Sequence, residues 1–95
     1  MEIGFDIRYH EAVTREDIPR LSRLWQSKVK SAIAVKLTTH PDIFGVPLRR
    51  SLRGYRKLRV GDYRVVFRIE VRAVKIFAIE HRSVVYARVL KRLGY

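Results

Sequence analysis

Three consecutive stretches in the second half of the chain alternate between apolar and polar residues, and this alternation restricts the fold more than any other feature. Residues 55–60, 63–70 and 73–80 show the two-residue period that is typical of a β-strand with one buried face. Only Gly61 and Asp62 separate the first two stretches, as in a two-residue hairpin turn with glycine at its first position. A second tight turn is predicted before the third stretch, whose more apolar composition indicates a central strand. The chain is therefore predicted to contain three consecutive antiparallel strands.

Similar periodicities predict the other regular elements. Residues 2–9 alternate in the same way and are predicted to form a further strand. Residues 20–39 carry apolar side chains at steps of three and four, which is typical of an amphipathic helix. A last helix is predicted over residues 83–93, with Ser83 as its N-cap.

The remaining segments are predicted from their helix-capping and helix-breaking residues. Thr14 is expected to cap a short first helix, and Pro19 is expected to end it or to open the next one. Two prolines and two glycines within residues 41–54 predict a loop with little regular structure. The resulting order predicts an α+β fold: a mostly antiparallel four-stranded sheet, two N-terminal helices packed on one face and a short C-terminal helix.

Length and composition exclude several classes of protein. A chain of 95 residues suffices for one domain, so residues 1–95 are predicted to form a single one. The absence of cysteine excludes disulfides, zinc–thiolate sites and cysteine nucleophiles. His10 and His40 lack the spacing of metal ligands, so both are predicted to be structural or incidental and no metal site is expected. Neither a membrane span nor a signal peptide is visible. We therefore expect a soluble, cytoplasmic protein without a cofactor.

The charge of the chain is strongly positive and unevenly distributed. Lys and Arg number 21 against 9 Asp and Glu, which gives a formal net charge of +12. Residues 1–17 have a net charge of −3 and the remainder has +15, most densely within residues 49–64. Because these charges repel one another, a polyanionic partner is expected: nucleic acid first, an acidic protein second and a membrane surface third. Alternatively, the basic residues form a solvent-exposed surface that binds no partner.

The predicted hairpin brings three basic side chains to one face of the sheet. If the turn is tight, alternation places Lys57, Arg59 and Arg64 on the same side. Because all the helices are expected on the opposite face, these cations would form an open site for an anion. Arg64 could alternatively form an ion pair with Asp62 or Glu80, which would contribute little at the surface.

Two motifs in the basic half resemble the RelE branch of the RelE/ParE toxin superfamily. They are L-R-V-G-D-Y-R at residues 58–64 and H-R-x-x-x-Y at residues 81–86. The length and the preceding strand–helix–helix order also match, so the resemblance extends over essentially the whole chain. It implies a toxin of a type II toxin–antitoxin pair. RelE toxins enter the ribosomal A site and cleave mRNA without a metal, whereas ParE relatives share the fold but act on DNA gyrase.

The resemblance implies catalytic roles for residues of the two motifs and the residue before the first. RNA supplies its own nucleophile, the 2′-OH, so the enzyme needs a base, cations for the phosphate and an acid. Lys57 matches the strand lysine proposed as the base, and its neighbours Arg56 and Arg59 favour the neutral amine that a base requires. Arg64 matches the arginine that stabilises the phosphate, and Arg59 occupies another basic position. Tyr86 matches the C-terminal tyrosine that stacks on or orients the nucleotide.

The proton donor differs from the family pattern. In ungapped alignment the arginine proposed as the acid falls at Glu80. The role is therefore transferred to Arg82, with His81 as the alternative because histidine donates protons readily near neutral pH. Tyr55 also stands where some RelE toxins have a second strand lysine.

The expected partners follow from the charge and the resemblance. The arginines predicted to bind RNA phosphates are Arg49, Arg50, Arg53, Arg56 and Arg59. The ribosome and mRNA are expected as partners, together with a cognate acidic antitoxin, but no membrane and no small-molecule cofactor. The antitoxin is expected to cover the basic face or to displace the C-terminal helix and with it Tyr86.

Trp25 is interpreted as a core or groove residue.

Two alternative functions remain at this stage. A ParE-like inhibitor of DNA gyrase would need no catalytic lysine, so replacing Lys57 would leave its toxicity unchanged. A catalytically degenerate homologue would bind RNA with a steep salt dependence but would cut nothing.

Overall fold

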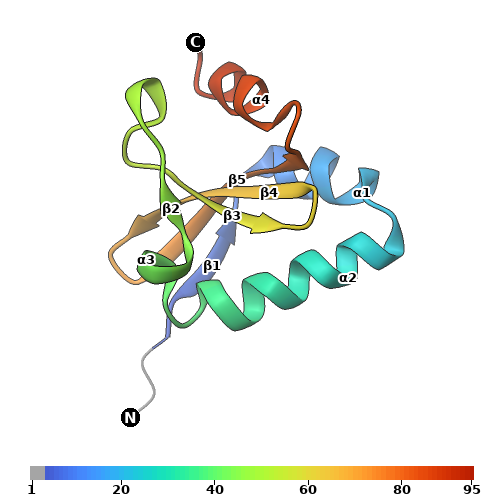
Figure 1. The fold of residues 1–95 in the computed structure, drawn as a ribbon, viewed down its shortest axis with the longest axis horizontal. Helices are drawn as coiled ribbons and strands as arrows, with labels where there is room; N and C mark the ends of the chain where they lie inside the picture. The colour runs from blue at the N-terminus through green and yellow to red at the C-terminus, as the bar shows by residue number, and fades with distance from the viewer. Residues whose placement is uncertain (1–3) are drawn as a thin grey trace.

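A mixed sheet of five strands lies at the centre of the computed structural model, which describes residues 4–95 (Figure 1). Its strand order is β1-β5-β4-β3-β2, with β1 parallel to β5 and all the other neighbours antiparallel. The strands are β1 (Asp6–Tyr9), β2 (Val46–Pro47), β3 (Arg56–Val60), β4 (Tyr63–Glu70) and β5 (Ala73–His81). The α+β class is confirmed, although the sheet contains one strand more than predicted.

The predicted run of three antiparallel strands is confirmed in β3, β4 and β5. The turn between β3 and β4 requires Gly61, because its φ of +60° is left-handed and an added Cβ would lie 2.4 Å from the Trp25 ring. β5 lies inside the sheet between β1 and β4, as its apolar composition indicated. The first predicted strand is observed from Asp6, while residues 2 and 3 lie outside the described residues.

The segment predicted as an irregular loop contains three short elements. These are α3 (Pro41–Phe44), the two-residue strand β2 and a 3₁₀ turn, η3 (Arg50–Leu52). β2 pairs with Arg56 and Lys57 at the start of β3, which makes it the edge of the sheet. Such short elements are too brief to show a period, so a prediction from periodicity could not detect them.

The N-terminal helical region forms a short helical segment followed by a longer one, in the predicted order. It comprises η1 (Val13–Asp17), α1 (Ile18–Arg20), α2 (Arg23–Ala32) and η2 (Ile33–Leu37), of which η1 and η2 are π-helical turns. The predicted start of the long helix at residue 20 is wrong because Ser22 caps α2, its hydroxyl accepting from the Trp25 amide at 3.3 Å.

Two predicted caps are also wrong. Thr14 lies inside the first helical turns and donates to the Glu11 carbonyl, whereas His10 Nδ1 accepts from the Ala12 amide at 3.0 Å. His10 therefore has a structural role, as predicted. Before α4 (Val85–Arg92), Val84 occupies the N-cap without a side-chain hydrogen bond. The Ser83 hydroxyl instead lies within hydrogen-bond distance of the His81 ring.

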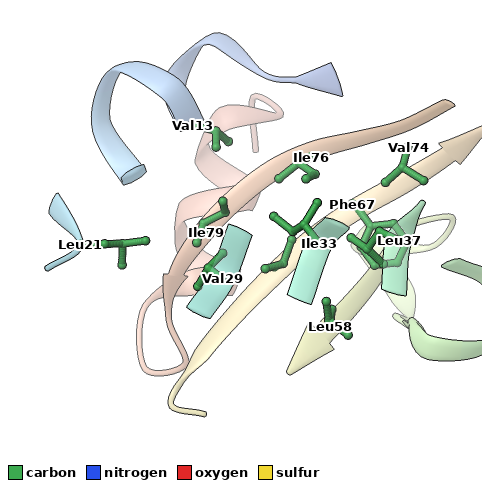
Figure 2. Close-up of a cluster of buried hydrophobic side chains, with 11 residues drawn as sticks. Val13, Leu21, Val29, Ile33, Leu37, Leu58, Phe67, Val74, Ile76 and Ile79 are labelled. Carbon is green, nitrogen blue, oxygen red and sulfur yellow. The ribbon is translucent and has the colours of Figure 1, made fainter. Parts of the chain in front are cut away.

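Two hydrophobic cores lie on opposite faces of the sheet. The α2-side core lies between the sheet and the N-terminal helical region (Figure 2). It consists of Val13, Leu21, Val29, Ile33, Leu37, Leu58, Val65, Phe67, Val74, Ile76 and Ile79. The α4-side core consists of Leu52, Tyr55, Val66, Phe77, Ala78, Val85 and Val89. Figure 1 shows α2 below the sheet and α4 above it. The prediction that all helices cover one face is therefore wrong.

The second core exists because β4 and β5 are apolar on both faces. Val65 and Val66 are adjacent and both fully buried, yet they belong to different cores. A register shift between Val66 and Phe67 places the neighbouring Phe77 and Ala78 of β5 together in the α4-side core. Trp25 packs against the α2-side core with its ring 5.0 Å from that of Tyr63, in agreement with its interpretation as a core residue.

Candidate active site

The predicted cluster of cations on one sheet face is observed. Arg59 and Arg64 are direct cross-strand partners, and Lys57 lies opposite Val66 of the α4-side core. Side chains of directly paired residues point to the same face, so Lys57, Arg59 and Arg64 all belong to the face that α4 covers. We call this part of β3 and β4 the cationic face. The helix does not cover it completely, since Arg59 is exposed and Lys57 and Arg64 are half-buried.

Helix α4 brings Tyr86 to the cationic face. The Nζ atom of Lys57 lies 5.9 Å from the centre of the Tyr86 ring, which is within the range of a cation–π contact. Tyr86 is partly buried and packs against the α4-side core. Two residues that lie far apart in the sequence are therefore joined in one site by the packing of α4 on the sheet.

Arg64 is held at the hairpin turn by backbone carbonyls. Its Nη1 atom donates to the carbonyls of Gly61 and Tyr63, at 2.9 Å each. Within residues 4–95 Arg64 forms no ion pair with Asp62 or Glu80, whose carboxylates contact other arginines. The alternative role of Arg64 as half of a surface salt bridge is thus not what the structure shows. Its side chain instead lies on the same face as that of Arg59, and among the described residues it forms no ion pair.

The two candidate proton donors lie in different places. His81 pairs with Tyr63 in the sheet, and their rings are 5.8 Å apart on the α2 side, opposite Lys57. Its Nδ1 atom is 2.8 Å from the Ser83 hydroxyl. Arg82 lies at the hairpin turn, where its amide donates to the Asp62 carbonyl at 2.8 Å and its Nε is 3.9 Å from the Asp62 carboxylate. Both residues thus lie beside the hairpin turn, but the His81 ring is on the face opposite Lys57, whereas the Arg82 side chain approaches Asp62 of the turn.

The other predicted phosphate ligands separate into two groups. Arg49, Arg50 and Arg53 are exposed on the segment between β2 and β3, which contributes Leu52 and Tyr55 to the α4-side core. This segment rises beside α4 in Figure 1. Arg56 differs from them, because its Nη1 donates to the carbonyls of Asp42 and Gly45 at 3.1 and 2.9 Å. Three of the arginines thus lie on an exposed segment on the α4 side of the sheet, while Arg56 contacts the α3 turn.

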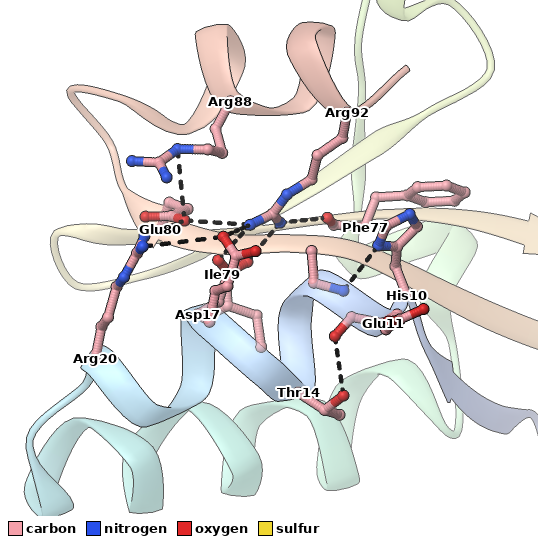
Figure 3. Close-up of polar contacts among 12 residues, drawn as sticks. His10, Glu11, Thr14, Asp17, Arg20, Phe77, Ile79, Glu80, Arg88 and Arg92 are labelled. Atoms are coloured by element: carbon pink, nitrogen blue, oxygen red, sulfur yellow. Dashed lines mark hydrogen bonds and ion pairs between the residues drawn. The ribbon is translucent and has the colours of Figure 1, made fainter. Parts of the chain in front are cut away.

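A buried charged cluster next to the cationic face was not predicted. Arg92 of α4 donates to both carboxylate oxygens of Asp17, at 2.6 and 2.7 Å, and to the Phe77 carbonyl at 2.8 Å (Figure 3). The Ile79 amide donates to the same Asp17 carboxylate at 2.9 Å. A third charged residue, Glu80, lies with one oxygen 3.6 Å from Arg92. We call Asp17, Glu80 and Arg92 the charged anchor.

The charged anchor alters the ionisation of its members. Burial opposes the ionisation of Asp17, but hydrogen bonds from Arg92 and the Ile79 amide outweigh it and hold the pKa of Asp17 below its ordinary value. Burial, followed by the neighbouring Asp17 carboxylate, raises the pKa of Glu80 to about 7, while Arg88 and Arg92 oppose the rise. Hydrogen bonding to Asp17 raises the pKa of Arg92. Near neutral pH, Asp17 and Arg92 are therefore fully charged and Glu80 is only partly ionised.

Three further features of the molecule concern the requirements of a ligand pocket, a metal site and a membrane span. A surface groove of about 690 Å³ lies between Ala12 and Glu16 on one side and α4 on the other, and neither Lys57 nor Tyr86 lines it. No group of three or more potential metal ligands occurs in residues 4–95. In the same described part of the chain, no helix is long and apolar enough to cross a membrane.

Comparison with known proteins places this chain in a family. The family model for the ParE toxin of the type II toxin–antitoxin system parDE matches residues 8–86. The chain belongs to the RelE/ParE toxin family. Among the curated members of this toxin family, Toxin RelE of Mycobacterium tuberculosis (strain H37Rv) is 35% identical over 86 residues, covering 85% of this chain and 89% of the relative. The family resemblance noted in the two sequence motifs is thereby confirmed.

Solved structures of related toxins share the architecture. In the toxin–antitoxin complex RelBE2 from Mycobacterium tuberculosis, one chain aligns with a TM-score of 0.78 and 28% identity, covering 87% of this toxin and 97% of that chain. YafQ from Escherichia coli aligns with a TM-score of 0.58 and 19% identity, covering 83% and 94%, which shows a common fold. The protein is thus a type II toxin with the sheet and helix arrangement of its relatives.

Proposed function

We propose that this toxin is a metal-independent endoribonuclease that cleaves mRNA in the ribosomal A site. The observation that carries the proposal is the meeting of Lys57 from β3 with Tyr86 from α4, beside the cross-strand pair Arg59 and Arg64. A base, an aromatic platform and two unneutralised cations are together what cleavage of an RNA backbone requires. The identity to Toxin RelE supports the same class of function.

The proposed reaction uses the 2′-OH of the substrate as nucleophile. Lys57 takes the proton of the 2′-OH, and the resulting oxygen attacks the adjacent phosphorus. The bond from phosphorus to the 5′-oxygen breaks, which leaves a 2′,3′-cyclic phosphate on one fragment and a 5′-OH on the other. Arg64 and Arg59 stabilise the additional negative charge on the phosphate oxygens in the transition state.

The leaving oxygen must regain a proton, and we assign this proton to Arg82. An alkoxide is more basic than a neutral guanidine, so a guanidinium can protonate it even though arginine is otherwise always charged. Arg82 lies at the same hairpin turn as the Arg64 guanidinium. His81 is the less suitable donor because its ring lies on the α2 side of the sheet.

The remaining contacts position the substrate. The half-buried Tyr86 ring offers a face on which an unpaired base can stack. The exposed Arg49, Arg50 and Arg53 can contact phosphates on either side of the scissile bond. Such contacts do not depend on base identity, which suits an enzyme whose substrate is held by the ribosome.

An acidic antitoxin is the expected partner in the resting state. The toxin carries a net charge of +12, and its relative in RelBE2 was solved as a toxin–antitoxin complex. We propose that the antitoxin either covers the cationic face or displaces α4 and removes Tyr86 from Lys57. Either route would block the site without unfolding the α2-side core.

The proposal is tested by primer extension on a translated mRNA in a reconstituted translation system. We expect the purified toxin to cut within A-site codons, and K57A and R64A to lose this activity by a factor of about 10² or more. K30A, which removes an exposed lysine from α2, serves as the matched control and should cut like the wild type.

Two other results would contradict the proposal in different ways. Inhibition of DNA gyrase with intact mRNA, unchanged in K57A, would identify the toxin as a ParE-like inhibitor, an alternative suggested by the matching family model. Salt-sensitive RNA binding without cleavage would identify a degenerate homologue.

A further inference from the structure

The end of α4 opposite Tyr86 is fastened by the charged anchor. We infer that Arg92 is a positioning residue, whose buried ion pair with Asp17 orients α4 so that Tyr86 stays over Lys57. The consequence for catalysis rests on the proposed function, whereas the orientation of α4 can be measured without it. Neither the two sequence motifs nor the chemistry proposed above assigns a role to Asp17 or Arg92.

The anchor connects three elements that are distant in the sequence. The side chain of Arg92 is 8% exposed and that of Asp17 is 0% exposed. Their two parallel hydrogen bonds form a bidentate pair, which fixes the direction as well as the distance between the groups. Because Asp17 belongs to η1 and Arg92 to α4, the pair ties the N-terminal helical region to the C-terminal helix around the sheet (Figure 3).

The same two side chains also bind the backbone of β5. β1 pairs with β5 only as far as Ile76, so within residues 4–95 no strand lies beside the following edge of β5. Asp17 accepts from the Ile79 amide and Arg92 donates to the Phe77 carbonyl on this segment. The anchor therefore replaces a missing strand partner, and it holds α4 at a defined position along β5.

Apolar packing alone would hold α4 less specifically. Val85 and Val89 face the α4-side core, and hydrophobic contact of this kind has little directional preference. The eight residues of α4 form a rod of about 12 Å, with Tyr86 in the first turn and Arg92 at the last position. A rotation or shift at Arg92 is consequently transmitted to the Tyr86 ring. The distance of 5.9 Å between that ring and Lys57 Nζ depends on this orientation.

Glu80 links the anchor to the cationic face. It is the cross-strand neighbour of Arg64, and its Oε2 atom is buried without a hydrogen bond. The same atom lies 3.6 Å from Arg92, 3.8 Å from Arg88 and 3.9 Å from Arg20. Three arginines therefore converge on the one carboxyl group of Glu80 at the edge of the site.

The first test measures the position of α4 without reference to activity. In D17N/R92Q, which removes both charges together, we expect amide hydrogens of α4 to exchange at least about 10-fold faster, while those of β4 stay protected. The Lys57 side-chain NMR signals should also lose the shift caused by the Tyr86 ring. K91Q, an exposed neighbour on α4, is the matched control and should resemble the wild type. Unchanged exchange and an unchanged Lys57 signal would overturn the inference.

The second test measures whether Arg92 acts through Tyr86. We expect kcat for ribosome-dependent cleavage to fall about 10- to 100-fold in D17N/R92Q, the loss typical of a small misplacement. In a Y86A background the same double substitution should lower kcat by less than about 3-fold further, because the Tyr86 ring that it would misplace is already absent. Effects that multiply fully would show that Arg92 does not act through Tyr86.

Folding and the proposed function are controlled separately. The fluorescence of Trp25, the single tryptophan, reports on the α2-side core and shows whether a variant is folded. If the double variant does not fold, R92K keeps the charge but lacks the bidentate geometry, and it should give the same changes at smaller size. If the wild type fails to cut mRNA, the proposed function is wrong, and the exchange and NMR measurements still decide the role of the anchor.

Discussion

The two faces of the sheet differ in what covers them. The α2 side is sealed by a continuous apolar core that extends from Val13 to Ile79. The α4 side is covered by a smaller core around Val66, and it leaves Lys57, Arg59 and Arg64 at its border. The α2 side therefore contains the larger of the two apolar cores. The α4 side holds the proposed active site together with α4 itself.

This difference is useful to a toxin that must be switched off by a partner. An element held by a large apolar core can be displaced only at a high cost in free energy. In contrast, α4 is held by two buried valines, the partly buried Tyr86 and Leu90, and the charged anchor, which is a smaller apolar contact than the α2-side core. The predictions below separate the two faces, beginning with the largest expected effect.

A matched pair of substitutions compares the two cores directly. Val65 and Val66 are the same residue type, adjacent in β4 and fully buried on opposite faces. We expect V65A to lower the free energy of unfolding by about 2–3 kcal/mol, from lost apolar burial and a cavity in the rigid core. V66A should cost only about 1–2 kcal/mol, because α4 can move to fill the space.

Denaturant unfolding followed by Trp25 fluorescence measures both values. V66A should also lower cleavage activity, because a shifted α4 misplaces Tyr86, whereas V65A should not. Equal losses of stability with equal activities would show that the two faces are equally rigid, and this would contradict the comparison.

The pH dependence of stability tests the charged anchor on the α4 side. The pKa of Glu80 is raised to about 7 from its ordinary 4.5, so between these values the folded protein holds a proton that the unfolded chain has released. Stability should therefore fall as the pH rises from about 4.5 to 7, by up to about 1.4 kcal/mol per pH unit from this group. Above pH 7 the contribution of Glu80 should be constant.

Glu80→Gln should remove this slope, which thermal or denaturant unfolding at several pH values would detect. Asp17 gives the opposite and separable signal. Because its pKa is lowered below 3.8, it stabilises the fold above that value, and the effect is lost only as the pH falls further. A slope between pH 5 and 7 that persists in Glu80→Gln would assign it to another group.

The smallest expected effect concerns the exposed arginines of the segment between β2 and β3. Replacing exposed Arg53 by Ala should weaken binding of single-stranded RNA and reduce the slope of log K against log salt by about 0.7, the value for one lost phosphate contact. Arg23→Ala on α2 is the control and should leave the slope unchanged. Equal changes in both variants, measured by fluorescence anisotropy over a salt series, would mean that RNA binding is not confined to the α4 side.

The features predicted correctly are those that depend on neighbouring residues. The period of two in β3 and β4 and the tight turn at Gly61 together set the register, so the common face of Lys57 and Arg64 could be read directly. The apolar steps in α2 indicated a buried face in the same way. The family resemblance lay in the same local motifs. The position of His81 away from Lys57 could not be recognised, because it depends on the pairing of β5 with Tyr63.

The sequence by itself determined β3, β4 and β5, the hairpin and the position of the cations on it, because a strand's period and a two-residue turn are short-range properties. Only the tertiary structure decided that α4 lies on the face opposite α2, since Val85 and Val89 could have packed against either side of the sheet. It also decided that Asp17 meets Arg92, 75 residues later. A buried ion pair forms where the whole fold excludes water from two side chains that are distant in the sequence. No local sequence pattern can therefore predict such a pair.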